Sequence, residues 1–309
     1  MNYTADGCRE PVLRLTESII FLLLGFAALW GNLLIVVAFY RKRSLRTVTN
    51  YLVLSLTVAD LLRAFLNLAL HFIASATNKW MLGEFGCIAG YVCCNIVAGT
   101  SLLTVMQMAV NRYLHLTKPA LRYKLFNKKY CIFMILSTWT STAVLVIGNT
   151  FSSKLRFKLL SYQPTVCFIE FASKKTGFYV SVLSRCLYVT VPAMVVVICY
   201  VKIYQTICAY KLSERNSMLV KSAVCAMEKV KTTRIVTVIV IAFYVCWLPV
   251  CFSILALHFG LITTKALKYW NFFYTFPVSV SSAINPIICA FMSRRFRHQF
   301  GLILKCRIN

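Results

Sequence analysis

The residues of this chain that could bind an ion or transmit a conformational change are polar groups placed inside long apolar runs. Asp60 is the one acid within such a run, and Arg63 and Arg185 are basic residues inside runs, apart from those that belong to the basic links at the run ends. An ionisable side chain surrounded by apolar sequence predicts a functional site, since burying its charge is costly. One carboxylate with neighbouring oxygen atoms suits a hard cation. We assign no catalytic residue and predict that the chain is not an enzyme.

Prolines inside three of the apolar runs point to helices that can bend. Pro192, Pro249 and Pro286 each interrupt the backbone hydrogen bonds of a predicted helix, and such kinks act as hinges.

A lipid bilayer is the medium that this composition requires. Of 309 residues, 60% are hydrophobic and 14% are charged, whereas soluble domains carry about 25% charged residues. The 34 Lys and Arg against 8 Asp and Glu would suggest nucleic acid on a soluble protein. Here the basic residues collect in short segments between apolar runs, without a zinc-finger or RNA-binding signature. We therefore exclude nucleic acid as a partner.

Seven apolar runs are long enough to cross a bilayer, for which a helix needs about 20 residues. They are Ser18–Tyr40, Asn50–Ala74, Phe85–Tyr113, Tyr130–Phe151, Phe178–Ile207, Thr232–Leu257 and Lys268–Met292. The stretch Ser293–Lys305 alternates arginine with apolar residues, which predicts an amphipathic helix on the membrane surface. We predict an all-α membrane protein with an outer N-terminus (1–17), a bundle of seven transmembrane helices (18–292), and a short amphipathic eighth helix with the cytoplasmic tail (293–309).

The distribution of Lys and Arg sets the orientation. With the N-terminus outside, the cytoplasmic segments contain 22 of them and the outer segments 10, and such an excess marks the cytoplasmic side. Asn2 then begins a glycosylation sequon on the outer side. Cys87 and Cys167 also lie outside, where a disulfide between them would hold the second outer link across the helix mouth. Cys306 is a candidate for palmitoylation, with an unmodified thiol as the alternative.

Each predicted span carries polar, aromatic or helix-breaking residues at particular places. They are Gly31-Asn32, Leu56-Thr57-Val58-Ala59-Asp60, Asn111-Arg112-Tyr113, Trp139, Pro192 with Tyr200, Phe243-Tyr244-Val245-Cys246-Trp247-Leu248-Pro249 and Asn285-Pro286-Ile287-Ile288-Cys289. In this order and on these spans, the set resembles the rhodopsin-like (class A) G-protein-coupled receptors, across nearly the whole chain.

The resemblance implies roles for these residues. Trp247, beneath the ligand cavity, and Phe243, one turn below, would report ligand occupancy to the sixth helix, with core packing as the alternative. Arg112 would meet the G protein once that helix swings outward. The other switch residues would be Asn111, Tyr113, Tyr200, Pro249, Pro286 and Cys289. A mid-membrane pocket that often holds a sodium ion, favouring the inactive state, would be formed by Asp60, Asn32, Ser101, Ser281 and Asn285.

Three positions depart from the family pattern, and all affect the same switch. Asn111 stands before Arg112 where most members have an acid, and Lys229 stands at the base of the sixth span where an acid would hold Arg112. The loss of both carboxylates predicts raised basal activity. Cys289 replaces the usual tyrosine, so Tyr200 loses the phenol that it would meet in the active state. Which effect prevails is left open by the sequence.

Two ligand classes are disfavoured by the residues at the expected pocket. The position that would need a lysine for retinal attachment is Ser279, and the position that would need an aspartate for an amine is Cys94. A buried ammonium without a carboxylate would be costly. We predict no retinal, no covalent cofactor, and an extracellular ligand that is neutral or anionic.

The pocket offers positive charge instead. Arg185, Arg63 and His71 could meet a carboxylate, phosphate or sulfate through forked hydrogen bonds. Each has an alternative: Arg63 could pair with Asp60 three residues earlier, Arg185 could extend to the outer interface, and His71 could be an ordinary polar residue. The candidate ligand-binding residues are Arg185, Arg63, His71, Cys94, Asn95, Asn149, Phe171, Trp247 and Ser279.

Within the family, the sequence is similar to the melatonin receptors. Trp80-Met81-Leu82-Gly83 and Asn111-Arg112-Tyr113 match, as does Asn149, where those receptors use an asparagine to bind the ligand's methoxy group. Phe171 replaces their glutamine, Asn285-Pro286 replaces their Asn-Ala, and they have no counterpart to Arg63 and Arg185. The resemblance implies a divergent melatonin-like or opsin-like receptor whose ligand need not be melatonin.

The sequence therefore predicts a multi-pass plasma-membrane receptor that converts binding of a small extracellular ligand or short peptide into nucleotide exchange on a heterotrimeric G protein. Gi/o coupling is implied by the resemblance alone. The alternatives are a weakly signalling relative and a seven-helix transporter, which would want repeats or broken midplane helices. The segment after Met292 contains one hydroxyl, Ser293, so we expect weak tail-dependent recruitment of arrestin.

Overall fold

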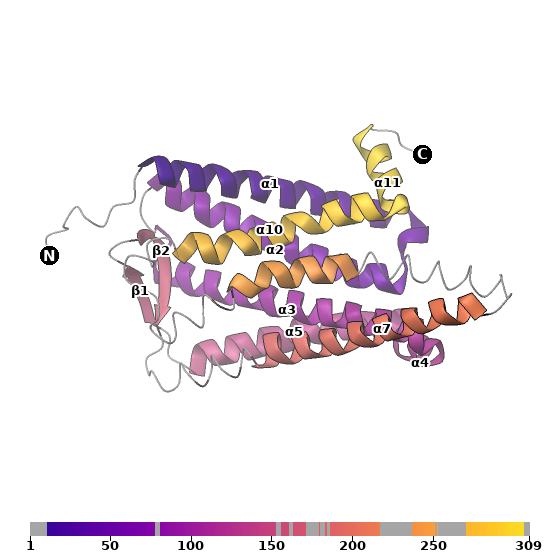
Figure 1. Cartoon of the computed structure of the whole chain (residues 1–309). Helices are drawn as coiled ribbons and strands as arrows, with labels where there is room; N and C mark the ends of the chain where they lie inside the picture. The colour runs from indigo at the N-terminus through magenta and orange to yellow at the C-terminus, as the bar shows by residue number, and fades with distance from the viewer. Residues whose placement is uncertain are drawn as a thin grey trace, which may run out of the picture.

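The computed structural model describes residues 11–77, 81–152, 156–160, 163–170, 179, 183, 186–216, 237–250, 252 and 270–305. Long helices that run side by side make up most of it (Figure 1). They are α1 (Pro11–Arg41), α2 (Val48–Thr77), α3 (Gly83–Thr117), α5 (Lys128–Ser152), α7 (Val191–Asn216), the helical segment Thr237–Val250 and α10 (Trp270–Met292). Each predicted span overlaps one of them, so the seven-helix prediction is confirmed.

The helices expose apolar side chains and bury charged ones. Leu23, Phe26 and Phe133 are exposed, whereas Asp60 and Arg63 are buried. Helices α1, α2, α3, α5 and α7 are each long and apolar enough to cross a membrane, and α10 passes the same test together with the helix that follows it. Hydrogen bonds within each helix satisfy its backbone, which is what a hydrocarbon environment demands.

Three short elements lie at the end of the bundle that carries the C-terminus. The 3-10 turn η2 (Arg43–Leu45) joins α1 to α2, and α4 (Pro119–Leu125) begins with proline, whose missing N–H is not needed there. α11 (Arg294–Leu304) begins after Ser293, whose Oγ accepts a hydrogen bond from the Phe296 amide at 3.5 Å. It turns 100° from α10 and buries its aromatic face against the bundle, as predicted for the eighth helix.

Pro192 distorts the start of α7. The five residues of η3 (Cys186–Thr190) form a π-helical turn shortly before it. Proline has no N–H to donate to the carbonyl of Tyr188, four residues earlier, and its ring clashes with that carbonyl. The predicted kink thus takes the form of a widened turn, a local geometry frequent at functional sites.

The second outer link folds into an antiparallel hairpin of β1 (Arg156–Leu160) and β2 (Gln163–Glu170), which the sequence analysis did not predict. Cys167 pairs with Leu159 in this hairpin. β2 contacts α3, and Cys87 near the start of α3 is disulfide-bonded. Cys167 therefore lies on a strand that touches the helix of Cys87, and the bond between these two cysteines stays a prediction.

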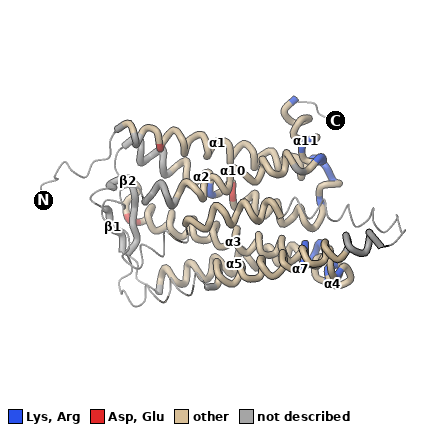
Figure 2. The backbone as a smooth tube through the Cα atoms, in the orientation of Figure 1, with Lys and Arg blue, Asp and Glu red and all other residues tan. Residues whose placement is uncertain are grey.

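Charge is unevenly distributed along the bundle axis. Lys and Arg gather at the end that carries α4 and α11, while most of the described helix length between the two ends carries no charge (Figure 2). This is the end that the excess of basic residues assigns to the cytoplasm. α1 begins at the opposite end (Figure 1).

Candidate functional site

Asp60, wholly buried on α2, lies at the centre of the site. Ser282 Oγ and Asn285 Nδ2, both from α10, donate to its Oδ1 and Oδ2, each at 2.8 Å. Asn32 on α1 donates through Nδ2 to the backbone carbonyls of Ala28 and Ser282 at 2.8 and 2.9 Å. Hydrogen bonds to an ionised group are about twice as strong as neutral ones, so the carboxylate helps to tie α2 to α10. Asn32 joins α1 to the same part of α10 through the Ser282 carbonyl.

Arg63 brings a second charge to the same place. It lies one turn further along α2 and is 3% exposed. Its Nη2 donates to Ser101 Oγ on α3 at 3.3 Å, and its guanidinium carbon lies 5.2 Å from the ring centroid of Trp247, a cation–π geometry. Arg63 also interacts electrostatically with Asp60. These contacts hold the guanidinium inside the bundle, and the choice between pairing with Asp60 and meeting a ligand stays open.

Trp247 and Phe243 stack on each other in the middle of the bundle. Their ring centroids are 5.6 Å apart and their planes differ by 25°. Phe243 belongs to the large apolar core, which also contains Met108 and Cys289. The aromatic pair therefore connects the guanidinium of Arg63 to the packed interior of the bundle.

The serine predicted at the carboxylate is one residue away from the one found there. Ser281 donates to the Val278 carbonyl at 2.9 Å, and its neighbour Ser282 is the residue that donates to Asp60. A shift of one residue rotates a side chain by about 100° around a helix, so only one of the two adjacent serines can face α2.

Several of the predicted sodium ligands already bind other groups. Ser101 Oγ donates to the Val97 carbonyl at 2.8 Å and accepts from Arg63, while both Asp60 oxygens accept from donors on α10. The Oδ1 atoms of Asn32 and Asn285 receive no hydrogen bond in the described structure and are acceptors that an ion could still use. A positive side chain also interacts electrostatically with the carboxylate, and the binding of sodium here stays a prediction.

Arg112 lies at the cytoplasmic end of α3 and is 5% exposed. Its Nε has no hydrogen-bond partner among the described residues, and its electrostatic neighbours there are Tyr200 and Arg122, neither of them an acid. Asn111, which precedes it, donates to Thr49 Oγ1 at 3.0 Å and accepts from Arg122 Nε at 3.5 Å. The asparagine thus binds other groups, and no acid is an electrostatic neighbour of Arg112 among the described residues.

The other predicted switch residues differ in burial. Pro286 is buried where α10 approaches α1, and a Cβ added at Gly31 would lie 2.8 Å from the Pro286 Cβ. This close approach explains why glycine precedes Asn32, since any side chain would separate the two helices. Tyr113 and Tyr200 are half-buried, Cys289 is buried, and Pro249 is exposed.

The predicted ligand-binding residues are described only in part. Cys94 and Asn95 are half-buried on α3, where Asn95 Nδ2 donates to the Tyr91 carbonyl at 2.8 Å, and Asn149 is half-buried on α5. Ser279 Oγ accepts from Asn67 Nδ2 at 3.3 Å. Outside the described residues lie Asn2, Phe171, Arg185, Lys229 and Cys306, and of His71 only the helical backbone is described.

Asn67 and Ser282 are site residues that the sequence analysis missed. The available signal was helical spacing, because Asp60, Arg63 and Asn67 share one face of α2. Ser279, Ser282 and Asn285 repeat every three residues on α10 and form the facing polar stripe.

Known proteins match this chain over most of its length. The pattern of the family described as 7 transmembrane receptor (rhodopsin family) matches residues 31–288. The tachykinin-like peptides receptor 86C of Drosophila melanogaster is 28% identical over 299 residues, which cover 94% of this chain and 58% of that receptor. The melatonin receptor type 1C of Gallus gallus is 29% identical over 313 residues, which cover 98% of this chain and 87% of that receptor.

A solved structure shows the same fold. The crystal structure of squid rhodopsin superposes with a TM-score of 0.81 and covers 97% of this chain and 89% of its own. The two sequences are 21% identical, so this likeness concerns the arrangement of the helices.

Proposed function

The chain belongs to the rhodopsin family of seven-transmembrane receptors, and from this premise we propose that it converts binding of an extracellular ligand into nucleotide exchange on a heterotrimeric G protein. It is a multi-pass protein of the plasma membrane, with the family and fold of receptors and not of enzymes. The chain spans 58% of the length of the tachykinin-like receptor, and the activity proposed is that of the shared helical bundle.

The observation that carries this proposal is the environment of Arg112. A guanidinium that is nearly buried and has no described acid beside it is costly to keep in the resting bundle. Movement of a neighbouring helix would expose it to water and to a protein partner. The segments 41–47, 112–129 and 294–309 contain basic residues and no acid, so this face complements an acidic partner surface.

The helical segment Thr237–Val250 provides the connection from the ligand side to this face. It carries Trp247 and Phe243 in the middle of the bundle and Thr237 at its other end, beside Tyr200. Tyr200 is in turn an electrostatic neighbour of Arg112. A ligand that displaces Trp247 would therefore displace the groups around Arg112 through one rigid helix.

The ligand that we propose is neutral or anionic. Cys94 provides no carboxylate for an amine, and Ser279, in the position of an attachment lysine, engages Asn67 and the Thr275 carbonyl. The names of the two relatives indicate a peptide and melatonin at nearly equal identity, so both a short peptide and a melatonin-like molecule should be screened. Coupling to Gi/o is proposed by resemblance alone.

Ligand-free G-protein activation tests the proposal. Wild type, Arg112→Ala and mock membranes are compared for nucleotide exchange on each class of Gα, with surface amounts matched. We expect exchange above mock in the wild type and at mock level in Arg112→Ala. Lys305→Ala, which removes an exposed basic side chain at the end of α11, should behave as wild type. Exchange that is unchanged by Arg112→Ala would refute the role given to this arginine, and silence of the wild type toward every Gα would favour the weakly signalling alternative.

A further inference from the structure

We propose that Arg63 is a built-in cation that takes the place of a sodium ion in the mid-membrane site and holds Trp247 in its resting position. The part about signalling rests on the proposed function, whereas the part about ion binding rests only on the geometry of the described residues.

The contacts of Arg63 are those that a bound cation would need. It interacts electrostatically with the carboxylate of Asp60 and donates to Ser101 Oγ, which it reaches across the gap between α2 and α3. Both partners were predicted as sodium ligands from the sequence. The arginine is 3% exposed and therefore has no access to bulk water.

A second cation would be repelled from this place. Two unit charges about 4 Å apart in a medium of effective dielectric constant near 20 repel strongly enough to weaken ion binding on the order of a thousandfold. The side-chain cation is also covalently attached, so its local concentration does not depend on salt. A receptor built in this way should not respond to sodium.

Arg63 also reaches the residue expected to move on activation. Trp247 is held by its stack on Phe243 and by the guanidinium of Arg63, and its Nε1 has no hydrogen bond in the described structure. Removing the guanidinium leaves the stack as the main specific restraint on the indole ring. We therefore class Arg63 as a positioning residue, which acts on the switch through Trp247.

Thermal unfolding of the purified receptor tests ion binding without any need for signalling. Wild type, Arg63→Leu and Arg63→Lys are compared in sodium chloride and in choline chloride, at an ionic strength of about 0.15 M. We expect no difference between the salts for wild type and Arg63→Lys. In Arg63→Leu, sodium should enter the vacated site beside Asp60 and raise Tm by about 2–4 °C.

Two results would overturn the ion-binding part. Sodium stabilisation of the wild type equal to that of Arg63→Leu would mean that arginine and sodium share the site. A folded Arg63→Leu that ignores sodium would mean that no cation site had been vacated. Where Arg63→Leu does not fold, Arg63→Gln removes the charge while keeping a polar group, and the same comparison applies.

Basal nucleotide exchange tests the restraint on Trp247. Arg63→Leu in choline should exceed the wild type severalfold, and sodium should lower it again, a salt response that lost packing alone would not produce. Arg63→Lys should keep the wild-type level. Unchanged exchange in a variant that does gain sodium stabilisation would refute the link to Trp247, while silence of every variant would count against the proposed function only.

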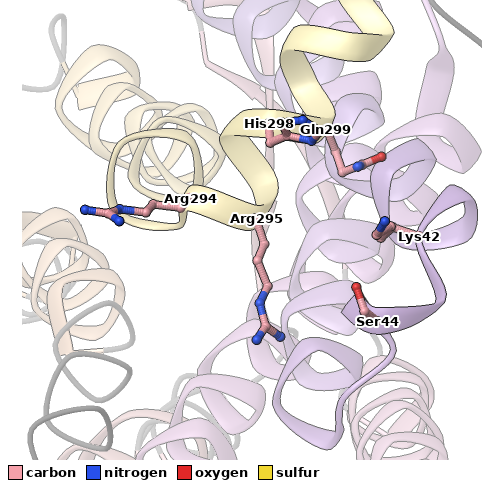
Figure 3. A pocket seen from close by; sticks show the side chains of 6 residues that line it. All are labelled: Lys42, Ser44, Arg294, Arg295, His298 and Gln299. Carbon is pink, nitrogen blue, oxygen red and sulfur yellow. The ribbon is translucent and has the colours of Figure 1, made fainter. Parts of the chain in front are cut away.

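A second inference comes from a separate observation at the cytoplasmic end. We propose that the cavity between η2 and α11 binds the phosphorylated headgroup of an anionic inner-leaflet lipid. The cavity measures about 450 Å³ and is lined by Lys42, Ser44, Arg294, Arg295, His298 and Gln299. Arg295 extends from α11 toward Ser44, with Lys42 beside them, whereas Arg294 points the other way (Figure 3).

The position of the cavity favours a lipid over a soluble anion. α11 turns 100° from α10, as expected of a helix on the membrane surface, and anionic lipids of the cytoplasmic leaflet attract basic residues there. The segments 41–47 and 294–309, which supply its lining, contain nine Lys and Arg and no acid. The volume lies within the range of small-molecule sites.

Binding to lipid nanodiscs tests this site. Wild-type receptor should bind fluorescent phosphatidylinositol bisphosphate about tenfold more tightly than the double variant Lys42→Ala/Arg295→Ala. This difference in Kd corresponds to about 1.4 kcal/mol. Lys305→Ala, an exposed basic change on the same helix, should bind as wild type. An equal loss in Lys305→Ala would indicate diffuse charge attraction, and equal affinity for soluble inositol trisphosphate would indicate a phosphate site; either result overturns the lipid proposal.

Discussion

Arg63 and Arg112 are both almost completely buried in one helical bundle, yet their surroundings differ. Arg63 has a carboxylate, a hydroxyl and an aromatic ring around it. Arg112 has a tyrosine and another arginine as its electrostatic neighbours, and its Nε has no described hydrogen-bond partner.

Depth in the membrane explains the difference. Water does not reach the middle of the bundle, so a charge there needs partners within the protein. Arg112 lies in the last part of α3, directly before α4, and α4 is at the basic end of the bundle (Figure 2). One helix movement there would bring water or a partner protein to it. Arg63 is therefore expected to stabilise the resting conformation, whereas Arg112 would become accessible when that conformation changes.

The largest effect is expected from removing the partner of Arg63. Asp60→Ala removes the carboxylate that interacts electrostatically with the buried guanidinium of Arg63 and should cost about 3–5 kcal/mol of stability. The double variant Asp60→Leu/Arg63→Leu should recover most of this loss, because it removes the charge together with its partner. Thermal unfolding at matched detergent concentration measures both. Equal destabilisation by the single and the double variant would show that Asp60 does not stabilise the buried charge of Arg63. The contrast between Arg63 and Arg112 would then be wrong.

The next largest effect is expected from packing near the site of Asp60 and Arg63. Gly31→Ala places a Cβ 2.8 Å from the Pro286 Cβ and should destabilise the receptor by about 1–3 kcal/mol through overpacking. Gly148→Ala is the matched control, since a Cβ there meets no atom within 4 Å. Two variants of equal stability would show that the contact between α1 and α10 can relax.

An acidic partner added beside Arg112 should lower signalling. Asn111→Asp puts a carboxylate next to Arg112, and an ion pair of about 1–2 kcal/mol shifts the ratio of resting to active receptor roughly 5–30-fold. Basal nucleotide exchange should fall accordingly. Asn111→Ala, which removes the amide without adding charge, should not lower it. A fall of the same size in Asn111→Ala would assign the effect to the lost Thr49 contact.

The stability of the receptor should change little when the charge of Arg112 is removed. Arg112→Leu takes away a buried cation that has no acid among its described electrostatic neighbours, so we expect the free energy of unfolding to be within about 1 kcal/mol of wild type, or higher. Signalling should nevertheless be lost. A destabilisation comparable to that of Asp60→Ala would show that Arg112 has a strong partner after all.

The smallest effect is expected from Arg122, which contacts Asn111 next to Arg112. Arg122 Nε reaches Asn111 Oδ1 at 3.5 Å, at the limit of a hydrogen bond. Arg122→Ala should therefore change stability by less than about 0.5 kcal/mol. A larger loss in thermal unfolding would mean that this contact orders the neighbourhood of Arg112.

Local patterns were sufficient to predict several features. Asp60 could be predicted as a site because burying an acid within an apolar run is costly. The amphipathic eighth helix followed from its alternation of arginine and apolar residues, and the orientation followed from the count of Lys and Arg. The π-helical turn before Pro192 and the hairpin of β1 and β2 were not predicted, because both depend on how the chain is held by its neighbours.

The sequence by itself determined the membrane environment, the seven spans, the orientation and the family, since each depends on composition or on spacing along the chain. Only the tertiary structure decided that Ser282 rather than Ser281 faces Asp60, because that depends on how α10 is rotated against α2. It also placed the guanidinium of Arg63 against Ser101 and Trp247, with Asp60 as an electrostatic neighbour. A long flexible side chain can reach several partners, and which of them it meets is set by the packing of three helices.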